Sequence, residues 1–177
     1  MSTARAIFTG PALRILVFIG LIGAFGLAAH SQTTVENDSI SISGDLPTLV
    51  TLKAADLDKM PQETVSQEDE DGNKIEYGGV LLKNVLEKAG APSGRSLRGK
   101  GLASYIVAKA RDDYEVVFTL AEMDPAFGNE KIVIVYKKDG KPLALAQGPF
   151  RLVCPADKAG ARSVRMLKSI EFVKLKK

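Results

Sequence analysis

The stretch from Asp139 to Val173 reads DGKPLALAQGPFRLVCPADKAGARSVRMLKSIEFV and carries the strongest structural signals in the chain. Its segments Phe150 to Cys154 and Val164 to Val173 are rich in apolar and β-branched residues, which favours two strands. Between them, Pro155 to Arg162 contains the small, polar and basic residues that are typical of a loop. The stretch therefore predicts a strand, a basic loop and a second strand.

Shorter strand patterns and a few helical patterns precede this stretch. An apolar stripe between Val80 and Ala89, followed by Gly90, predicts the clearest helix. A hairpin is expected between Glu63 and Tyr77, with its turn in the acidic residues that follow Glu68. Further strands are expected at 39–43, 49–52, 104–108, 114–119 and 131–136, and short helical segments at 54–60 and 120–124. Because strands outnumber helices and tight turns join them, we expect the α+β class with a mixed, mostly antiparallel sheet and a few short helices.

Residues 1–31 have the three parts of a secretory signal peptide. Arg5 and Arg14 supply positive charge, Ile15 to Ala29 form an apolar run, and small residues surround the end at Ser31. The run is shorter than the roughly 20 apolar residues of a spanning helix, although retention as a membrane anchor is the alternative. We expect cleavage after Ser31, export to the periplasm or the medium, and no stable membrane insertion afterwards. Residues 32–39 are then a flexible leader, and 40–177 form the functional domain.

Charge and composition narrow the chemistry of the mature chain. Removing residues 1–31 lowers Lys plus Arg from 24 to 22 against 21 Asp plus Glu, and it also removes the single histidine. A nearly neutral domain gives little support for nucleic-acid binding, which usually needs a concentrated basic face. Without histidine, Ser–His and Cys–His nucleophile systems and histidine metal sites are excluded. One cysteine cannot form an internal disulfide.

Two features suggest metal or thiol chemistry but have simpler interpretations. Cys154 shares one face of its expected strand with Phe150 and Leu152, where a thiol is usually a small buried hydrophobe. A metal ligand or a nucleophile is the alternative at that position. The acidic run Glu68 to Asp71 favours a solvated turn, because a calcium loop needs ligands at wider, regular spacing. We therefore expect no metal site.

Basic residues gather in and around the loop of the opening stretch. The group consists of four basic residues, one hydroxyl residue and one glycine: Arg151, Lys158, Gly160, Arg162, Ser163 and Arg165. Cationic side chains, a hydroxyl group and loop N–H groups together favour a seat for a phosphate or another anion. An ordinary solvated basic rim is the alternative.

With YGGVLLKNVLEKAG at 77–90 and YEVVFTLAEMD at 114–124, the opening stretch resembles the molybdopterin-binding oxidoreductase domain of the sulfite oxidase family. The similarity runs from about residue 40 to 175 and is greatest to short, exported, single-domain members. It implies their fold and molybdopterin as a cofactor. In that family a glycine, a basic residue and a serine at the end of the loop contact the pterin and its phosphate. Gly160, Arg162 and Ser163 match them, with Lys158 and Arg165 close by in the sequence.

The chain departs from that family where its catalytic members bind molybdenum. They use a cysteine just after the strand that precedes the helix, but residues 63–80 here read ETVSQEDEDGNKIEYGGV. Cys154 lies on a different strand. We therefore expect an exported ligand-binding or interaction module without redox chemistry of its own, whose partner is a small anion, a pterin or a protein. The alternative is a molybdopterin-dependent oxidoreductase, or a subunit of one, in the periplasm; no catalytic residue is assigned.

Overall fold

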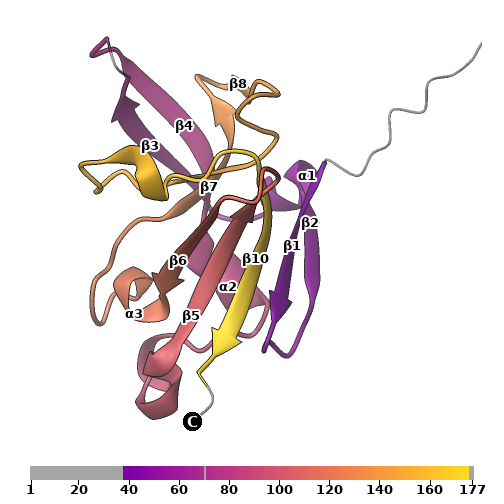
Figure 1. Ribbon diagram of the computed structural model, residues 1–177, viewed down its shortest axis with the longest axis vertical. Coiled ribbons are helices and arrows are strands. Elements are labelled where there is room, and N and C mark those ends of the chain that lie inside the picture. Colours follow the sequence, from indigo (N-terminus) through magenta and orange to yellow (C-terminus); the bar gives the residue numbers. More distant parts are fainter. Residues whose placement is uncertain (1–37, 70, 176–177) are drawn as a thin grey trace, which may run out of the picture. The chain divides into compact units, whose positions relative to one another are not determined.

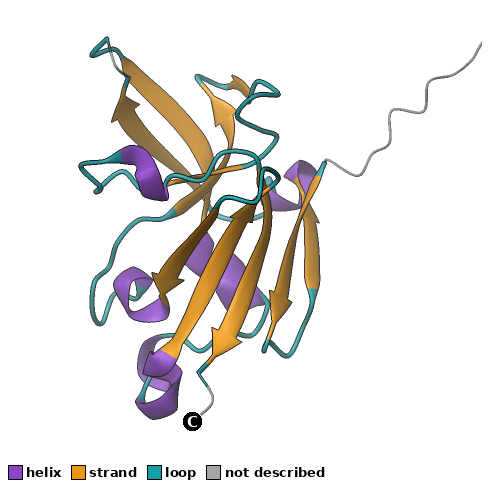
Figure 2. Cartoon of the chain, viewed as in Figure 1, coloured by secondary structure: helices purple, strands orange, loops and turns teal. Residues whose placement is uncertain are grey.

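The structure is a computed structural model that describes residues 38–69 and 71–175, all within the unit Thr34–Lys177. The expected signal peptide, residues 1–31, lies outside the described residues, as does all of the expected leader except its last two positions. Ser39, the last leader residue, already belongs to the first strand. Figure 1 shows two sheets with short helices beside them, and Figure 2 colours the same view by secondary structure.

The first sheet, which we call sheet A, has five strands within the described residues. They are β1 (Ser39–Gly44), β2 (Val50–Lys53), β5 (Ser104–Ala110), β6 (Glu115–Thr119) and β10 (Leu167–Lys174). Their order is β2-β1-β10-β5-β6. β1 pairs with β10 in parallel, whereas the remaining neighbours pair antiparallel. The last strand of the chain therefore lies in the middle of sheet A.

The second sheet, sheet B, is antiparallel throughout the described residues. Its strands are β3 (Gln62–Glu68), β4 (Lys74–Leu81), β7 (Val133–Lys138), β8 (Lys141–Pro142) and β9 (Arg151–Val153). β3 and β4 form the expected hairpin, with Val65 opposite Tyr77. β9 pairs with β7 beside the hairpin. Together the two sheets confirm the α+β class with mixed, mostly antiparallel pairing.

The helices are short and connect the strands. The α-helices are α1 (Ala54–Leu57), α2 (Leu82–Lys88) and α3 (Leu120–Met123), and the 3₁₀ turns are η2 (Gly94–Ser96), η3 (Gly99–Ala103) and η4 (Gly160–Arg162). The expected helix start was wrong at Val80 and Leu81, which belong to β4 because they pair with β7. The expected strand start at Val164 was also wrong: Met166 has a positive φ of 47°, and β10 begins at Leu167.

Two hydrophobic clusters stabilise the fold. The main cluster joins the inner residues of sheet A to α2 and sheet B, and includes Phe118, Phe172 and Leu86. A smaller cluster contains Val133, Val135 and Val153 of sheet B together with Val65, Tyr77 and Leu143. Burying this apolar surface supplies the main favourable term in folding. Successive residues of a strand point to opposite faces, so each strand of sheet B can contribute to both clusters.

Candidate functional site

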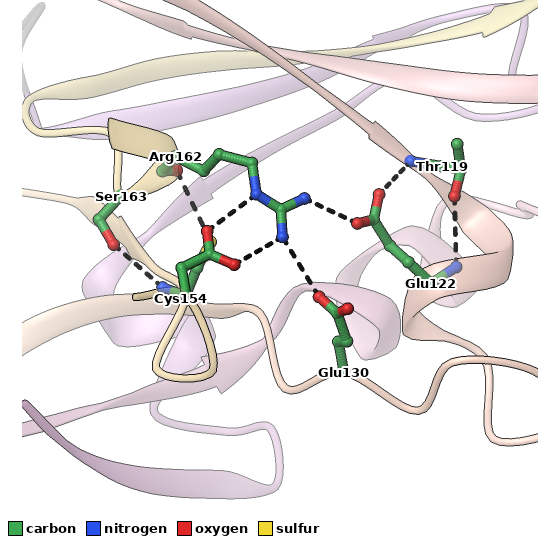
Figure 3. A network of polar contacts seen from close by, with 7 residues as sticks. Thr119, Glu122, Glu130, Cys154, Arg162 and Ser163 are labelled. Atoms are coloured by element: carbon green, nitrogen blue, oxygen red, sulfur yellow. Dashed lines mark hydrogen bonds and ion pairs between the residues drawn. The ribbon is translucent and has the colours of Figure 1, made fainter. Parts of the chain in front are cut away.

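Arg162 lies among three carboxylates (Figure 3). Its Nε and Nη2 donate to the two oxygens of Asp157 at 2.8 and 2.7 Å. Its Nη1 donates to Glu122 at 2.8 Å, and Nη2 also donates to Glu130 at 3.3 Å. Asp157 in particular raises the pKa of Arg162, and Arg162 in turn lowers the pKa of Asp157. The guanidinium is therefore already paired with acids, and the three carboxylates outnumber its single positive charge.

Glu122 is in place for Arg162 because the local sequence forms a capping box. Thr119 and Glu122 have the spacing of that motif at the start of α3. The Thr119 N–H donates to Glu122 Oε1, and the Glu122 N–H donates to Thr119 Oγ1 at 3.3 Å. The other carboxylate oxygen of Glu122 accepts the bond from Arg162 (Figure 3). The Arg162 side chain thus holds η4 against the start of α3.

Cys154 is buried in the main cluster. Only 3 % of the residue is exposed, and burial raises the pKa of its thiol to about 12. The thiol donates a hydrogen bond to the Arg162 carbonyl oxygen at 3.6 Å, and the Cys154 N–H donates to Ser163 Oγ at 3.1 Å. The expectation that Cys154 shares a buried face with Phe150 and Leu152 is confirmed. A buried thiol of high pKa is chemically inert at neutral pH.

Three of the predicted site residues line one cavity of about 240 Å³. Gly160, Ser163 and Arg165 form one wall, and Asp112 and Tyr114 contribute from the turn between β5 and β6. No heavy atom lies within 4 Å of the position that a Cβ on Gly160 would take, so the space beside this glycine is open. We call this cavity the loop pocket. Of the three remaining predicted residues, Arg162 points toward α3, and neither the exposed Lys158 nor the buried Arg151 lines the pocket.

Arg151 is a buried cation without a carboxylate partner among the described residues. Only 9 % of the residue is exposed; its Nη1 donates to Tyr77 Oη at 3.0 Å and to Gln147 Oε1 at 3.3 Å. Its Nε has no hydrogen-bond partner in the same part of the chain. Burial lowers the pKa of Arg151, and the positive charge of Arg165 lowers it further. Leaving a buried charge unpaired is costly, so this arrangement singles out the residue as a candidate anion contact.

The sequence already places Arg151 in the basic group, and strand alternation indicates which way its side chain points. Arg151 lies between Phe150 and Leu152, both of which belong to the main cluster, so its side chain must point to the other face of β9. The sequence does not show which residues bury that face of β9. Tyr77 and Leu143 come from distant segments and form the smaller cluster on that face together with Val153.

A larger groove of about 420 Å³ lies between α2, η2 and the segment after α3. Most of its charged groups already have partners. Lys83 pairs with Glu87 at 2.9 Å, and Asp124 accepts hydrogen bonds from the N–H groups of Gly94 and Ala126 at 2.6 and 2.9 Å. The loop pocket is the stronger candidate for anion binding because it is lined by Gly160, Ser163 and Arg165, three of the residues that the sequence predicts for an anion site.

The part of the chain that the structure describes contains no group of three or more His, Cys, Asp or Glu side chains able to hold a metal ion. None of its helices is long and apolar enough to cross a membrane.

Comparison with known proteins identifies the class to which this fold belongs. Residues 28–177 match the family described as the oxidoreductase molybdopterin binding domain, so the chain belongs to that family. Among solved structures, the crystal structure of the sulfane dehydrogenase SoxCD from Paracoccus pantotrophus aligns with a TM-score of 0.61 at 16 % identity. The alignment covers 80 % of this chain and 40 % of that one, and at this identity it shows the fold alone. A search of curated proteins found no significant match.

The described residues fit molybdopterin only in part. The resemblance to the sulfite oxidase family's molybdopterin-binding domain is confirmed, and Arg151 and Arg165 offer unpaired positive charge to an anionic group. The residues do not fit the molybdenum atom of the cofactor. The single thiol of the chain is inside the main cluster, and the hairpin β3–β4 contains no cysteine. These residues therefore support no reaction step at molybdenum.

Proposed function

We propose that this chain is an exported binding module with the fold of the molybdopterin-binding oxidoreductase domain. It binds a small anionic ligand and performs no molybdenum redox chemistry of its own. The observation that carries this proposal is the exposed Arg165 side chain in the loop pocket, beside Ser163 and the open space at Gly160. Neither Arg165 nor the buried Arg151 forms an ion pair within residues 38–69 and 71–175. An anion that enters the loop pocket supplies the missing negative charge.

Each residue of the loop has a distinct role in this proposal. Arg165 meets the anion directly, because it is exposed and lines the pocket. Arg151 contributes its charge from a buried position, where electrostatic interactions are screened less than at the surface. Arg162 is a positioning residue: its bonds to Asp157 and Glu122 hold η4, and so the adjacent Ser163, in place. Gly160 leaves room for the ligand.

Binding of inorganic phosphate and sulfate tests the proposal. The melting temperature of the purified protein should rise with phosphate concentration, as mass action requires for a ligand that binds the folded state. Arg165→Gln should weaken this stabilisation about tenfold in apparent affinity, since charge-assisted hydrogen bonds contribute about 1.5–3 kcal/mol. Lys158→Gln removes the same charge from the same loop outside the pocket and should leave it unchanged. Equal effects of the two substitutions, or no stabilisation by phosphate, would refute a specific site.

Export is part of the proposal and rests on residues 1–31. Expression in a host with a periplasm, followed by intact-mass measurement, should yield a chain that begins at Gln32. A full-length chain in the membrane fraction would instead indicate a retained anchor.

The second candidate is a molybdopterin-dependent oxidoreductase, or a subunit of one. Membership of the family supports it, together with Gly160, Arg162 and Ser163 at the family's contact positions. Protein purified from its native compartment should then carry pterin fluorescence and molybdenum. One tightly held molybdenum atom per chain would overturn the proposal of a module without redox chemistry.

A further inference from the structure

We infer that the ligand of the loop pocket is a small zwitterion, whose anionic group binds Arg165 and whose ammonium group binds Asp112. This inference rests on the proposed function and adds the chemical class of the ligand. The lining of the pocket contains one cationic and one acidic side chain, Arg165 and Asp112. They do not form an ion pair with each other, so a ligand that carries both charges can satisfy both.

Asp112 is held in an orientation that leaves one carboxylate oxygen available. Its Oδ1 accepts a hydrogen bond from the Tyr114 N–H at 3.3 Å, which fixes the side chain over its own turn. Its Oδ2 makes no hydrogen bond or ion pair within the described residues. An ammonium group is the natural partner for such an oxygen, because it donates up to three hydrogen bonds.

The two walls of the pocket are tied together on both sides of Asp112. Tyr114 Oη donates to the carbonyl oxygen of Ala161 at 2.7 Å, which links the β5–β6 turn to η4. The Arg111 N–H donates to the carbonyl oxygen of Met166 at 3.1 Å, which links the same turn to the start of β10. The backbones that carry Asp112 and Arg165 are therefore held at a set separation before any ligand arrives, and preorganisation of this kind lowers the cost of binding.

The size of the pocket suits a small molecule. Its volume of about 240 Å³ is below the roughly 300–1,000 Å³ of pockets that take drug-sized ligands. An aminoalkyl phosphate or an amino acid has the required charges within that space. Tyr114, which is 47 % exposed, offers an apolar ring beside the two charged groups.

The test compares zwitterionic with anionic probes on the same protein. Thermal-shift titrations use inorganic phosphate, O-phosphoethanolamine and 3-aminopropyl phosphate, with wild type, Asp112→Asn and Asp113→Asn. The better aminoalkyl phosphate should bind wild type about two- to fivefold tighter than phosphate, the range expected for one exposed ion pair. Asp112→Asn should remove this preference without weakening phosphate binding, because it deletes a carboxylate that repels phosphate.

The control and the outcomes separate this inference from the function on which it rests. Asp113→Asn makes the same charge change one residue away and outside the pocket, and asparagine tolerates the positive φ of 65° at that position. It should keep the preference for the aminoalkyl phosphates. Phosphate binding without that preference, or a preference that survives Asp112→Asn, would overturn the zwitterion and leave the anion site standing. No stabilisation by any of the three probes would overturn both.

Discussion

Adjacent residues of β9 lie in two different environments, and this alternation decides the chemistry of Arg151 and Cys154. Cys154 follows Phe150 and Leu152 into the main cluster, where the thiol is an apolar filler. Arg151 points to the smaller cluster around Tyr77 and keeps a full charge there. The segment therefore contains the only cysteine of the chain and the most buried arginine of the described residues, on opposite faces.

Cys154 should not react with thiol reagents in the folded protein. Its thiol pKa of about 12 leaves a negligible thiolate fraction at about pH 8, and the surrounding apolar residues block access. Ellman's reagent at that pH should give no colour with native protein and one thiol per chain in guanidinium chloride. Rapid reaction of the native protein would show that Cys154 is accessible and reopen its candidacy as a metal ligand or nucleophile.

Arg151→Met should stabilise the protein while weakening phosphate binding. The substitution keeps an apolar side chain in the small cluster and removes a buried charge whose Nε has no partner. We expect the free energy of unfolding to rise by about 1 kcal/mol in urea denaturation.

Arg162→Met is the matched substitution with the opposite expected sign. It leaves Asp157, Glu122 and Glu130 facing one another without a cation, and should cost about 1–3 kcal/mol because the site is partly exposed. If Arg151→Met lowered the free energy of unfolding more than Arg162→Met, the buried charge of Arg151 would stabilise the fold. Stability alone would then account for Arg151, without a ligand.

At the level of secondary-structure elements, β4 meets β7 at a bulge in which position 79 has room only for glycine. The register shifts between Gly78 and Gly79, and Tyr136 of β7 has no partner across it. A methyl group on Gly79 would overlap the carbonyl oxygen of Ile134. Tyr136 lies on the same face of β7 as Ile134, in the main cluster, and its hydroxyl donates to Asp58 Oδ1 at 2.7 Å.

Gly79→Ala should therefore be strongly destabilising and Gly78→Ala nearly silent. For Gly79 we expect a loss of about 3 kcal/mol in the free energy of unfolding, because two backbones must separate. A methyl on Gly78 meets only Lys137 Cβ at 3.6 Å, and the cost should stay within about 1 kcal/mol. Chemical denaturation of both variants measures the difference. Similar costs would mean that the bulge can relax.

The same region shows which element boundaries sequence patterns can predict. The hairpin β3–β4 and the strands β5 and β6 lie where alternation and turn residues place them, whereas β7 begins two residues later than expected and continues to Lys138. Val80 and Leu81 were assigned to a helix because a short apolar run suits both a helix face and a buried strand. Only the pairing of these residues with Ile134 and Val133 decides for the strand, and that contact is more than fifty residues away in the chain.

For the whole molecule, acid should weaken the fold through carboxylates whose pKa values are lowered. The N–H groups of Gly94 and Ala126 lower the pKa of Asp124, and Arg162 lowers that of Asp157. A lowered pKa adds stability that is present above the unfolded-state pKa, near 3.8, and is lost as pH falls through the folded-state value. Urea denaturation should therefore give a smaller free energy of unfolding at about pH 3 than at about pH 6.

Asp124→Asn serves as the matched variant for this pH dependence. It removes one of the titrating groups, so its stability should fall less steeply on acidification than that of wild type, although it starts lower at about pH 6. Parallel curves for the two proteins would show that Asp124 does not contribute to the acid response.

The candidate site illustrates what sequence alone can predict at the scale of the molecule. The loop and its basic character are visible in the sequence, and Gly160, Ser163 and Arg165 do line one pocket. The sequence does not reveal that Arg162 is paired with acids, because Glu122, Glu130 and Asp157 come from three separate segments. Nor does it place Asp112 opposite Arg165, which depends on the register of β5 with β10.

The parallel pairing of β1 with β10 has a consequence for how the chain is made. The first described strand and the last are neighbours, and β10 also separates β1 from β5. Until Leu167 to Lys174 have left the ribosome, β1 lacks the neighbour that joins it to the rest of sheet A, and that late contact slows folding. The centre of sheet A therefore stays incomplete until residues 167–174 are available to pair with both β1 and β5.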